Sequence, residues 1–463
     1  MMLLTDPQET SGESAYRAIR TDIVNGRLAP RSRLRLEALK LQYSASISTL
    51  REALYRLSSE GLVVTEKRGF EVAPVSEQEF AELAALRELL ETHAMRESFR
   101  AGNLEWEGNV VGAFHKLSRM EQLMLAGDRS HSDVWKSYDR EFHRALISSC
   151  GSDELLRAHG AIFDRFQRYQ IVAVIFRGQV AAKEHHALMA AALDRRIDAA
   201  AEVLRCHIQG CIEHTSSHGL LQQSGLVRRD TGPRIRPDRP ENAGDLSVGE
   251  SSWRRVRGDI LMGRLAPQQK LRLETLRAAY GVSISTLREI LNRLTSEGLV
   301  VAEGQRGFEV APVSAENLRE IAQLRLLVEA QALEHSFAAG DVEWEARLVT
   351  AYHKLASLEE RMASNDRSAA ELWKQYDWQF HQVLISACGS QMLMQLHGAI
   401  FDKYLRYQMI ALSYRGRIAA DEHRELHDCA LRRDAVGARA VLERHLEGGV
   451  AHALASGIFE DQR

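Results

Sequence analysis

An aspartate and a histidine stand four residues apart once in each half of the chain, as Asp139 with His143 and as Asp377 with His381. On a helix, side chains four residues apart lie on one face, so each pair could bind a single ion. Two more histidines follow each pair at matching distances, and these are His185 and His207 in the first half and His423 and His445 in the second. One carboxylate with three imidazoles suits zinc, nickel, manganese or iron. We therefore expect one divalent transition-metal site in each half.

Each of these residues also has an ordinary structural interpretation. A lone histidine on a half-buried helix is usually a hydrogen-bonded core residue, and a lone D-x-x-x-H pair is most often a surface pair. The presence of all four residues in two diverged copies favours the metal interpretation. A metal site with open positions could also activate water, which would make the chain a metal-dependent hydrolytic enzyme. No HExxH-type general base accompanies the histidines, so we expect no enzymatic activity.

Other repeated residues near these histidines rank lower as candidates. Surface or packing roles are expected for the remaining repeated histidines, which are His115 with His353 and His159 with His397. Core positions are expected for two aromatic pairs, which are Trp135 with Tyr138 and Trp373 with Tyr376.

The stretch 46–57 has the pattern of the second helix of a helix-turn-helix. A buried stripe is predicted by apolar residues at spacings of three and four, which are Leu50, Ala53, Leu54 and Leu57. Ser46 or Ser48 can cap the start of this helix, and Gly61 ends it before two short β-like runs, at 62–64 and 69–72. Because two more helical segments precede it, the sequence predicts a winged helix-turn-helix. The same stretch returns at 283–301.

The repetition covers a whole unit of about 200 residues rather than one motif. Segments 27–30 and 159–164 recur as 264–267 and 397–402, with an offset of 237 residues early and 238 later. After each wing the sequence is helical in periodicity, with no convincing strand. We therefore predict a mainly α protein with two copies of a winged helix-turn-helix and an all-α bundle. The expected boundaries are 9–75 and 76–221 for the first copy, 222–250 for a Pro-rich linker, and 251–313 and 314–458 for the second copy.

The net charge of −3 hides an uneven distribution. Residues 16–73 hold 11 Lys or Arg against 6 Asp or Glu, and residues 253–311 hold 10 against 6, which leaves −12 for the remainder. Two basic modules on an acidic body are expected when only the small modules contact phosphate. The chain has no run of 18 apolar residues, and its five cysteines form no CxxC pair. We expect a cytoplasmic protein without a membrane segment.

With these motifs in place, each copy resembles a GntR-family transcription regulator of the FadR type. The winged-helix part carries Ser-Thr-Leu-Arg-Glu-Ala-Leu, then Glu-Gly-Leu-Val and Arg-Gly-Phe-Glu-Val, and the helical part is similar to the family's ligand-binding FCD domain. The resemblance covers nearly the whole chain except the N-terminal tail and the linker. Two features depart from the family. Ile47 and Ile284 stand where many members have a base-contacting arginine, and members are typically dimers of single units.

The resemblance implies functional roles for individual residues. The aspartate and three histidines of each bundle would bind one divalent metal ion. A small organic acid effector would pair with Arg87 or Arg325. The ordinary interpretation of these two arginines is that each is exposed and forms a salt bridge. In both heads, DNA contact would involve the recognition helix and its neighbours, with base readout resting mainly on Arg51 and Arg288. The expected set is Arg35, Ser46, Ser48, Thr49, Arg51 and Arg68 in the first head, and Arg272, Ser283, Ser285, Thr286, Arg288 and Arg306 in the second.

We therefore expect a DNA-binding transcriptional regulator, by family default a repressor, whose binding to double-stranded operator DNA responds to a carboxylate effector at the metal site. Two alternatives remain open at this point: a metal-dependent hydrolytic enzyme, and a regulator in which one half acts only as a scaffold. Because one chain contains two heads and two bundles, it could form an intramolecular pseudo-dimer or a homodimer.

Overall fold

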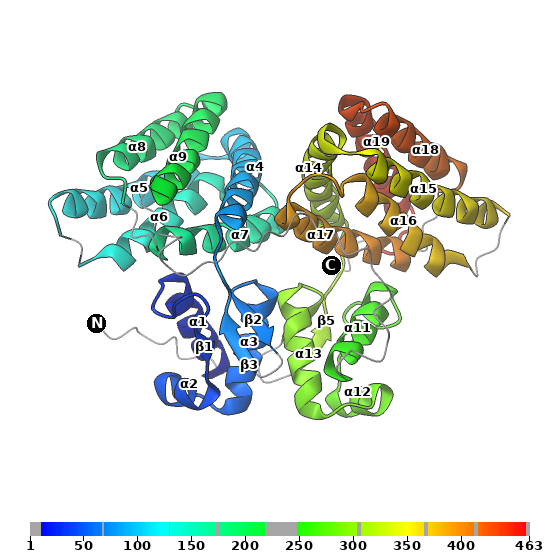
Figure 1. The fold of residues 1–463 in the computed structure, drawn as a ribbon, viewed down its shortest axis with the longest axis horizontal. Helices are drawn as coiled ribbons and strands as arrows, with labels where there is room; N and C mark the ends of the chain where they lie inside the picture. Colours follow the sequence, from blue (N-terminus) through cyan, green and yellow to red (C-terminus); the bar gives the residue numbers. More distant parts are fainter. Residues whose placement is uncertain are drawn as a thin grey trace. The chain divides into compact units, whose positions relative to one another are not determined.

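The computed structural model describes residues 11–66, 69–128, 130–172, 176–217, 248–302, 307–364, 369–411 and 415–459. The chain divides into two compact units, Met1–Asp230 and Thr231–Arg463, called unit 1 and unit 2 below. Each unit contains a small winged helix and a larger set of helices, and the fold is mainly α (Figure 1). None of the helices in the described part of the chain is both long and apolar enough to span a bilayer.

The winged helix of unit 1 contains three helices and a three-stranded antiparallel sheet. The helices are α1 (Ser11–Val24), α2 (Leu36–Tyr43) and α3 (Ile47–Ser59), and the strands are β1 (Arg33–Leu34), β2 (Val63–Glu66) and β3 (Gly69–Val72). The order in the sheet is β1-β3-β2, with Val63 opposite Val72 and Leu34 opposite Phe70. The sequence predicts β2 and β3 but misses β1, because two residues are too few to show an alternating pattern.

The recognition helix α3 follows the predicted pattern closely. Ser46 is its N-cap and accepts a hydrogen bond from the backbone amide of Thr49, so Ser46 rather than Ser48 starts the helix. The four apolar residues of the predicted stripe are buried and belong to the core of the winged helix. Gly61 follows with φ +74°, a conformation that favours glycine, and lets the chain turn into β2.

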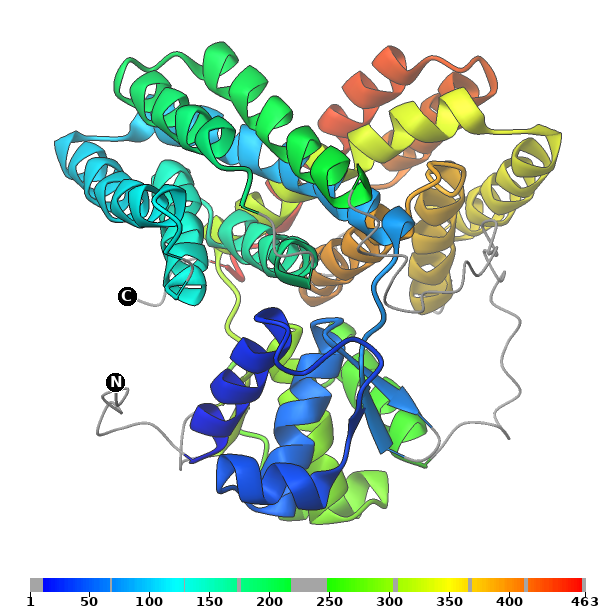
Figure 2. The same cartoon turned by 60° about the vertical axis from the view of Figure 1, so that its left-hand side comes forward.

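The helical domain of unit 1 follows the wing without a further strand in its described residues. Its helices are α4 (Glu77–Ala101), α5 (Leu104–Leu125), α6 (Ser132–Ile147), α7 (Asp153–Val172), α8 (Gln179–Leu193) and α9 (Ile197–Ser217). Helix α4 packs against α6, α7 and α9, while α5 packs against α6 and α8. The winged helix, in blue, lies beside one end of this domain and contacts α7 (Figure 2).

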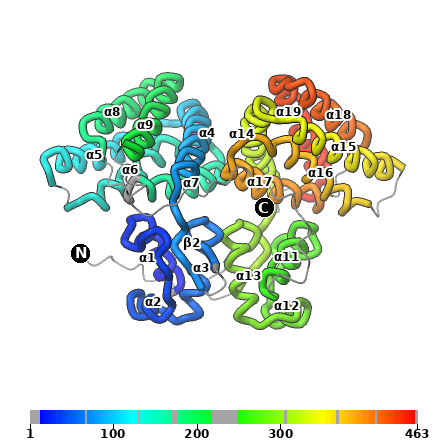
Figure 3. Tube along the Cα trace, viewed as in Figure 1, coloured from blue at the N-terminus to red at the C-terminus, as the bar shows by residue number. Residues whose placement is uncertain are grey.

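Unit 2 repeats this order of elements, which can be followed from green to red in the trace of Figure 3. Its winged helix contains α11 (Val248–Leu261), α12 (Leu273–Tyr280), α13 (Ile284–Ser296), β4 (Val300–Ala302) and β5 (Phe308–Val310). Its helical domain contains α14 (Ala315–Ala339), α15 (Val342–Ala363), α16 (Ala370–Leu384), α17 (Gln391–Ile410), α18 (Arg417–Leu431) and α19 (Ala435–Leu454). Helix α11 begins at Val248, so the last three residues of the segment 222–250 are helical. Residues 222–247 lie outside the described residues.

Candidate metal centres and DNA-reading helices

The four predicted metal ligands of unit 1 come together in the middle of the helical domain. Asp139 and His143 lie one turn apart on α6, His185 lies on α8, and His207 lies on α9. All four are buried, and one potential ligand atom from each lies within 4.8 Å of the others. Three different helices therefore bring a carboxylate and three imidazoles around a single point, which is the arrangement that a metal ion requires.

Three glutamates fix the orientation of the three imidazole rings. The Nδ1 of His143 donates to Glu91 at 2.5 Å, that of His185 to Glu121 at 2.7 Å, and that of His207 to Glu184 at 2.8 Å. With Nδ1 engaged, Nε2 is left to face the common centre. The buried Nε2 atom of His143 has no hydrogen-bond partner, and that of His185 lies 3.3 Å from Asp139 Oδ1. A carboxylate behind each ligating histidine is the usual outer layer of a metal site.

The electrostatics of this cluster favour a cation at its centre. Burial opposes ionisation of Asp139, but hydrogen bonding to His185 and the nearby charges of His143 and Lys136 hold its pKa well below the usual range. Burial lowers the pKa of His207 to about 3, so this imidazole is neutral and able to ligate. The pKa of His185 is raised to about 9 despite burial, because it lies between Asp139 and Glu121. A positive charge at this position is therefore stabilised by two carboxylates.

Unit 2 brings its three histidines together in the same way, and Asp377 Oδ1 lies 3.8 Å from His381 Nε2, as Asp139 Oδ1 lies 4.0 Å from His143 Nε2 in unit 1. His381, His423 and His445 form the cluster, and their Nδ1 atoms donate to Glu329, Glu359 and Glu422, respectively. Of the four ligands expected in unit 2, Asp377 alone falls outside the group in which all ligand atoms lie within 4.8 Å of one another.

A buried lysine lies on the other side of Asp377 from the histidine cluster. Its Oδ1 lies 3.2 Å from the Nε2 of His423, whereas its Oδ2 lies 3.6 Å from the Nζ of Lys374. Lys374 is buried, and burial lowers its pKa to about 8 although Asp377 stabilises its charge. Lys136 is the counterpart of Lys374 and interacts with Asp139, so the carboxylate of each unit lies between a buried lysine and the histidine cluster.

The arginines Arg87 and Arg325 are buried, not exposed as in their ordinary interpretation. The Nε of Arg87 donates to Glu91 at 2.9 Å, and the guanidinium carbon lies 4.3 Å from the centroid of the Phe163 ring. Arg325 repeats both contacts with Glu329, at 2.8 Å, and Phe401, at 4.1 Å. One terminal nitrogen of each arginine is buried without a hydrogen-bond partner. Each arginine shares its glutamate with a cluster histidine and therefore lies beside the candidate metal centre.

Sequence reasoning did not find the glutamates behind the histidines. A signal was present, because Glu91, Glu121 and Glu184 recur at the common offset of 238 as Glu329, Glu359 and Glu422. Glutamate is, however, common on helices, and no short motif links these residues to the histidines. His159 and His397 also proved to be close to the centre: each is buried, and its Nε2 donates to Glu91 or Glu329.

The lower-ranked candidates are divided between surface and core. His115 and His353 are exposed. Trp135 and Trp373 are buried as expected, whereas their partners Tyr138 and Tyr376 are only half-buried, so the prediction of core positions was wrong for both tyrosines.

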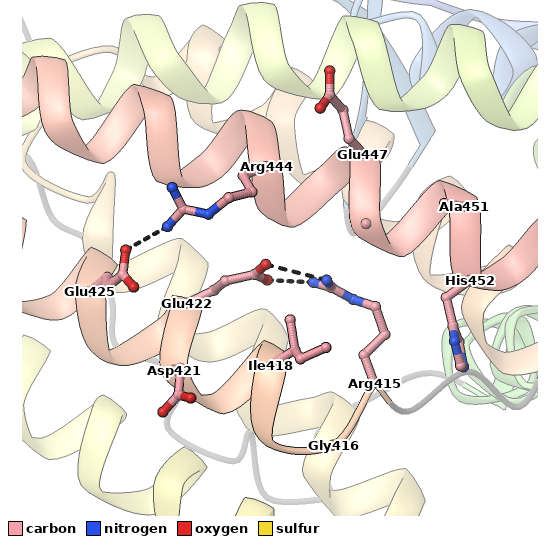
Figure 4. Close-up of a pocket in the computed structure, with 11 residues that line it drawn as sticks. Arg415, Gly416, Ile418, Asp421, Glu422, Glu425, Arg444, Glu447, Ala451 and His452 are labelled. Atoms are coloured by element: carbon pink, nitrogen blue, oxygen red, sulfur yellow. Dashed lines mark hydrogen bonds and ion pairs between the residues drawn. The ribbon is translucent and has the colours of Figure 1, made fainter.

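A surface groove of about 1110 Å³ leads toward the centre of unit 2 between α18 and α19. Arg415 and Glu422 form an ion pair in its wall, with Arg415 NH2 2.5 Å from Glu422 Oε2 (Figure 4). Arg415 also lines a cavity of about 10 Å³ that borders Asp377, His423 and His445. The Arg415–Glu422 pair therefore lies between the open groove and the histidine cluster.

The expected DNA-contacting residues are located on the outer side of each winged helix. Arg51 on α3 and Arg288 on α13 are exposed, as are Arg35 and Arg272 at the N-termini of α2 and α12. The polar residues at the start of the recognition helices are exposed or half-buried, and they are Ser46, Ser48, Thr49, Ser283, Ser285 and Thr286. Arg68 and Arg306 lie outside the described residues.

One sequence difference between the two heads does not concern DNA. Ala53 corresponds to Ile290, and both side chains are only 4% exposed because they face the cores of their winged helices. Tyr55, which corresponds to Asn292, is half-buried and packs edge-on against Phe70, with ring centroids 5.0 Å apart. The Ala53/Ile290 difference thus alters core packing and leaves the exposed face of the recognition helix unchanged.

Comparison with known proteins places both kinds of domain. Residues 11–72 and 253–310 match the model "Bacterial regulatory proteins, gntR family", and residues 82–210 and 320–448 match the FCD domain. Both winged helices match the family model, which weakens the alternative that one half is only a scaffold.

Relatives of known sequence correspond to one unit of this chain. The HTH-type transcriptional regulator BphR of Paraburkholderia xenovorans is 37% identical over 207 residues, which are 44% of this chain and 84% of BphR. The HTH-type transcriptional repressor GlaR of Escherichia coli is 32% identical over 202 residues, 42% of this chain and 90% of GlaR. Among solved structures, Escherichia coli McbR/YncC is 18% identical, with a TM-score of 0.40, and the match covers 47% of this chain and 100% of that protein.

These names are those of transcriptional regulators and not of enzymes, which argues against a metal-dependent hydrolase. The matched segments include both winged helices and both helical domains. The chain belongs to the gntR family of bacterial regulatory proteins and is a DNA-binding transcriptional regulator with duplicated GntR and FCD domains.

Proposed function

We propose that each helical domain binds one divalent transition-metal ion and a small carboxylate effector, and that the bound effector changes the affinity of the attached winged helix for operator DNA. The main support is the set of three buried imidazoles whose Nδ1 atoms are held by glutamates and whose Nε2 atoms face one point. Because GlaR, which is similar to this chain, is named a repressor, we propose repression as the mode of regulation.

The donor set fits a borderline metal ion. A buried imidazole nitrogen is costly unless a cation or a hydrogen-bond partner satisfies it, and the Nε2 atoms of His143 and His381 have no hydrogen-bond partner among the described residues. Zinc, nickel, manganese and iron all accept imidazole with carboxylate, so the residues alone do not select among them. When bound, such an ion would offer open positions to a carboxylate oxygen.

The buried arginine supports an anionic effector. Arg87 is almost completely buried, and its pairing with Glu91 leaves the NH1 atom without a partner. A guanidinium nitrogen buried in this way favours an additional negatively charged oxygen. A carboxylate near the His143 side of the centre would supply it. Arg325 and Glu329 repeat this arrangement in unit 2.

Helix α7 connects the candidate centre to the DNA-binding head of unit 1. Its His159 contacts Glu91, and its Phe163 lies against Arg87. Further along, Arg168 donates to the backbone carbonyl of Ala73, at the end of the wing. A shift of α7 at the centre would therefore also move the segment that joins the wing to α4.

Two further contacts strengthen this connection. The backbone amide of Ser76, the N-cap of α4, donates to the hydroxyl of Tyr169 at 3.1 Å. Asp164 of α7 accepts hydrogen bonds from Arg20 of α1 and Arg140 of α6. Burial, reinforced by the nearby Glu79, raises the pKa of Tyr169 far above the working range, so its hydroxyl remains protonated. These polar contacts give α7 a defined position against the head.

The same contacts recur in unit 2. Arg406 donates to the carbonyl of Ala311, the amide of Ser314 donates to the hydroxyl of Tyr407 at 3.2 Å, and Arg257 pairs with Asp402. Each unit thus contains one candidate effector centre coupled to one head. We propose that the two heads of one chain occupy one operator, either as an intramolecular pseudo-dimer or within a homodimer.

Metal analysis of full-length protein tests the proposal. We expect about two divalent ions per chain. Both should be lost when His185→Ala and His423→Ala are combined, because each substitution removes one candidate ligand from one centre. The matched control combines His115→Ala with His353→Ala, which are exposed histidines. Gel-shift titrations with the protein's own upstream DNA, before and after chelation, test regulation. Equal metal content in wild type and the ligand double variant would reject these ligands.

A further inference from the structure

The two candidate effector centres differ by a coupled exchange of residues. Phe166 on α7 corresponds to Tyr404 on α17, and Cys211 on α9 corresponds to Gly449 on α19. Phe166, Tyr404 and Cys211 are all buried. A Cβ atom added to Gly449 would overlap the hydroxyl oxygen of Tyr404. The hydroxyl therefore occupies space that a side chain at position 449 would need, and the two differences form a single exchange.

The exchange lies directly beside the histidine cluster of unit 2. Gly449 lines the cavity of about 10 Å³ that is also bordered by Lys374, Gln408 and the cluster residues Asp377, His423 and His445. This volume is roughly that of one buried water. Lys374 Nζ donates to Gln408 Oε1 at 2.6 Å, and the Tyr404 side chain is hydrogen-bonded to Gln408. Because Gly449 has no side chain, the Tyr404 hydroxyl can lie next to these polar groups at the edge of the cavity.

The aromatic ring at this position also supports the buried arginine. The guanidinium carbon of Arg325 lies 4.9 Å from the centroid of the Tyr404 ring, and Arg87 lies at the same distance from Phe166. The two units therefore share the position of the ring below the arginine and differ in its hydroxyl. In unit 1 the thiol of Cys211 is hydrogen-bonded to Arg177, so the cysteine side chain stands where the Tyr404 hydroxyl lies against Gly449 in unit 2.

The surface approach to the cluster differs in charge as well. The groove of unit 2 carries four carboxylates and two guanidinium groups, which belong to Asp421, Glu422, Glu425, Glu447, Arg415 and Arg444 (Figure 4). The corresponding residues of unit 1 are Lys183, Glu184, Ala187, Gln209, Arg177 and Cys206. Only Glu213, which replaces Ala451, adds a carboxylate in unit 1. The more acidic groove of unit 2 disfavours the entry of ligands with two negative charges relative to ligands with one.

We propose that the two centres of one chain select different ligands, with Tyr404 and Gly449 as the pair that makes unit 2 specific for a monocarboxylate bearing additional hydroxyl groups. Lys374 and Gln408 have the counterparts Lys136 and Gln170 in unit 1, so the difference comes from the ring. An added hydroxyl on the ligand can hydrogen-bond to the Tyr404 hydroxyl in unit 2, whereas next to Phe166 it would be buried without a partner. Unit 1 accordingly takes a carboxylate without that hydroxyl. This inference rests on the proposed function, namely that both centres bind a metal ion and a carboxylate.

Calorimetric titration of zinc-loaded, full-length protein with L-lactate and L-glycerate tests the inference. The two acids share a carboxylate and a 2-hydroxyl, so chelation of the zinc is matched, and glycerate adds one further hydroxyl. We expect glycerate to show two classes of site whose Kd values differ about tenfold, which corresponds to about one buried hydrogen bond. Lactate should show a smaller difference between the sites.

Exchange variants assign the difference to this pair. Tyr404→Phe with Gly449→Cys should convert unit 2 to the behaviour of unit 1, leaving two equivalent weak sites for glycerate. The reciprocal pair, Phe166→Tyr with Cys211→Gly, should give two tight sites. Zinc content and thermal unfolding report whether each variant is folded. If an exchange variant does not fold, Tyr404→Phe alone replaces it, because this substitution removes only the hydroxyl. It should weaken the binding of glycerate at one site and leave the binding of lactate unchanged.

The outcomes separate this inference from the proposed function. If zinc-loaded wild type binds both acids but every variant retains its glycerate-to-lactate ratio at both sites, the specificity role of Tyr404 and Gly449 is overturned while the carboxylate centre stands. If neither acid binds zinc-loaded protein more tightly than chelator-treated protein, the proposed carboxylate centre fails, and the inference fails with it.

Discussion

Asp402 on α17 accepts a hydrogen bond at 2.6 Å from Arg257 on α11, a residue 145 positions earlier in the chain. The residue before it, Phe401, lies beneath the buried guanidinium group of Arg325. Consecutive residues on a helix point about 100° apart, so α17 contacts the candidate effector centre with one side and the DNA-binding head with another. Asp164 and Phe163 repeat this relationship on α7.

Combined Asp164→Asn and Asp402→Asn substitutions should weaken communication between the centre and the head. The loss of charge removes the ion pairs with Arg20 and Arg257 but leaves the metal ligands in place. Allosteric coupling is typically worth about 1–3 kcal/mol, and we expect the variant to lose most of the change in operator affinity that chelation causes in wild type. Quantitative gel shifts measure this change. Glu97→Gln, which affects an exposed pair with Arg100, is the control. An unchanged response to chelation would show that the coupling runs elsewhere.

Combined Glu121→Gln and Glu359→Gln substitutions should lower metal affinity without removing a ligand. Each glutamate accepts the Nδ1 proton of a cluster histidine, at 2.7 Å in unit 1 and 2.6 Å in unit 2. Loss of such a partner typically costs about 10–100-fold in metal affinity. Competition with a chromophoric chelator gives the affinity, and the exposed pair Glu105→Gln with Glu343→Gln gives the baseline. Wild-type affinity in the first double variant would mean that these glutamates do not orient metal ligands.

Arg51→Ala and Arg288→Ala should each weaken operator binding. Both arginines are exposed on recognition helices, where a guanidinium group could contact guanine or phosphate. A base contact should cost about 1–3 kcal/mol and relax specificity at one operator position, whereas a phosphate contact should weaken binding to all sequences alike. Fluorescence anisotropy with operator variants distinguishes the two. Arg119→Ala, an exposed substitution on α5, is the control. Wild-type affinity and specificity in both variants would remove these residues from the interface.

A single chain should bind one operator with both heads. The 26 residues 222–247 separate the two copies, and a random coil of about this length has a root-mean-square span of roughly 30 Å, close to one helical turn of DNA between half-sites. The polar residues at the start of the two recognition helices are identical, with Ser48, Thr49 and Arg51 matching Ser285, Thr286 and Arg288. Similar half-sites are therefore expected, with differences limited to positions near Tyr55 and Asn292. Light scattering of the free protein and of its operator complex gives the stoichiometry. Two chains with four heads on one operator would refute the one-chain assembly but not the regulator function.

The sequence alone located the helices of the recognition motif and of the candidate centres and identified the principal candidate residues, although it missed the two-residue strand β1. Apolar residues three and four apart define one face of a helix, and this local periodicity is enough to locate α3 and its buried stripe. Asp139 and His143 lie on the same face of α6 for the same reason. The repetition at a constant offset then connected these residues to His185 and His207.

Only the tertiary structure decided which helix faces meet. The glutamates behind the histidines come from α4, α5 and α8, and no local pattern indicates that these faces contact α6, α8 and α9. The burial of Arg87, the orientation of Asp377 toward Lys374, and the space shared by Tyr404 and Gly449 depend on packing between segments distant in sequence. Periodicity specifies the direction of a side chain relative to its own helix axis, whereas its neighbours depend on how the helices pack against one another.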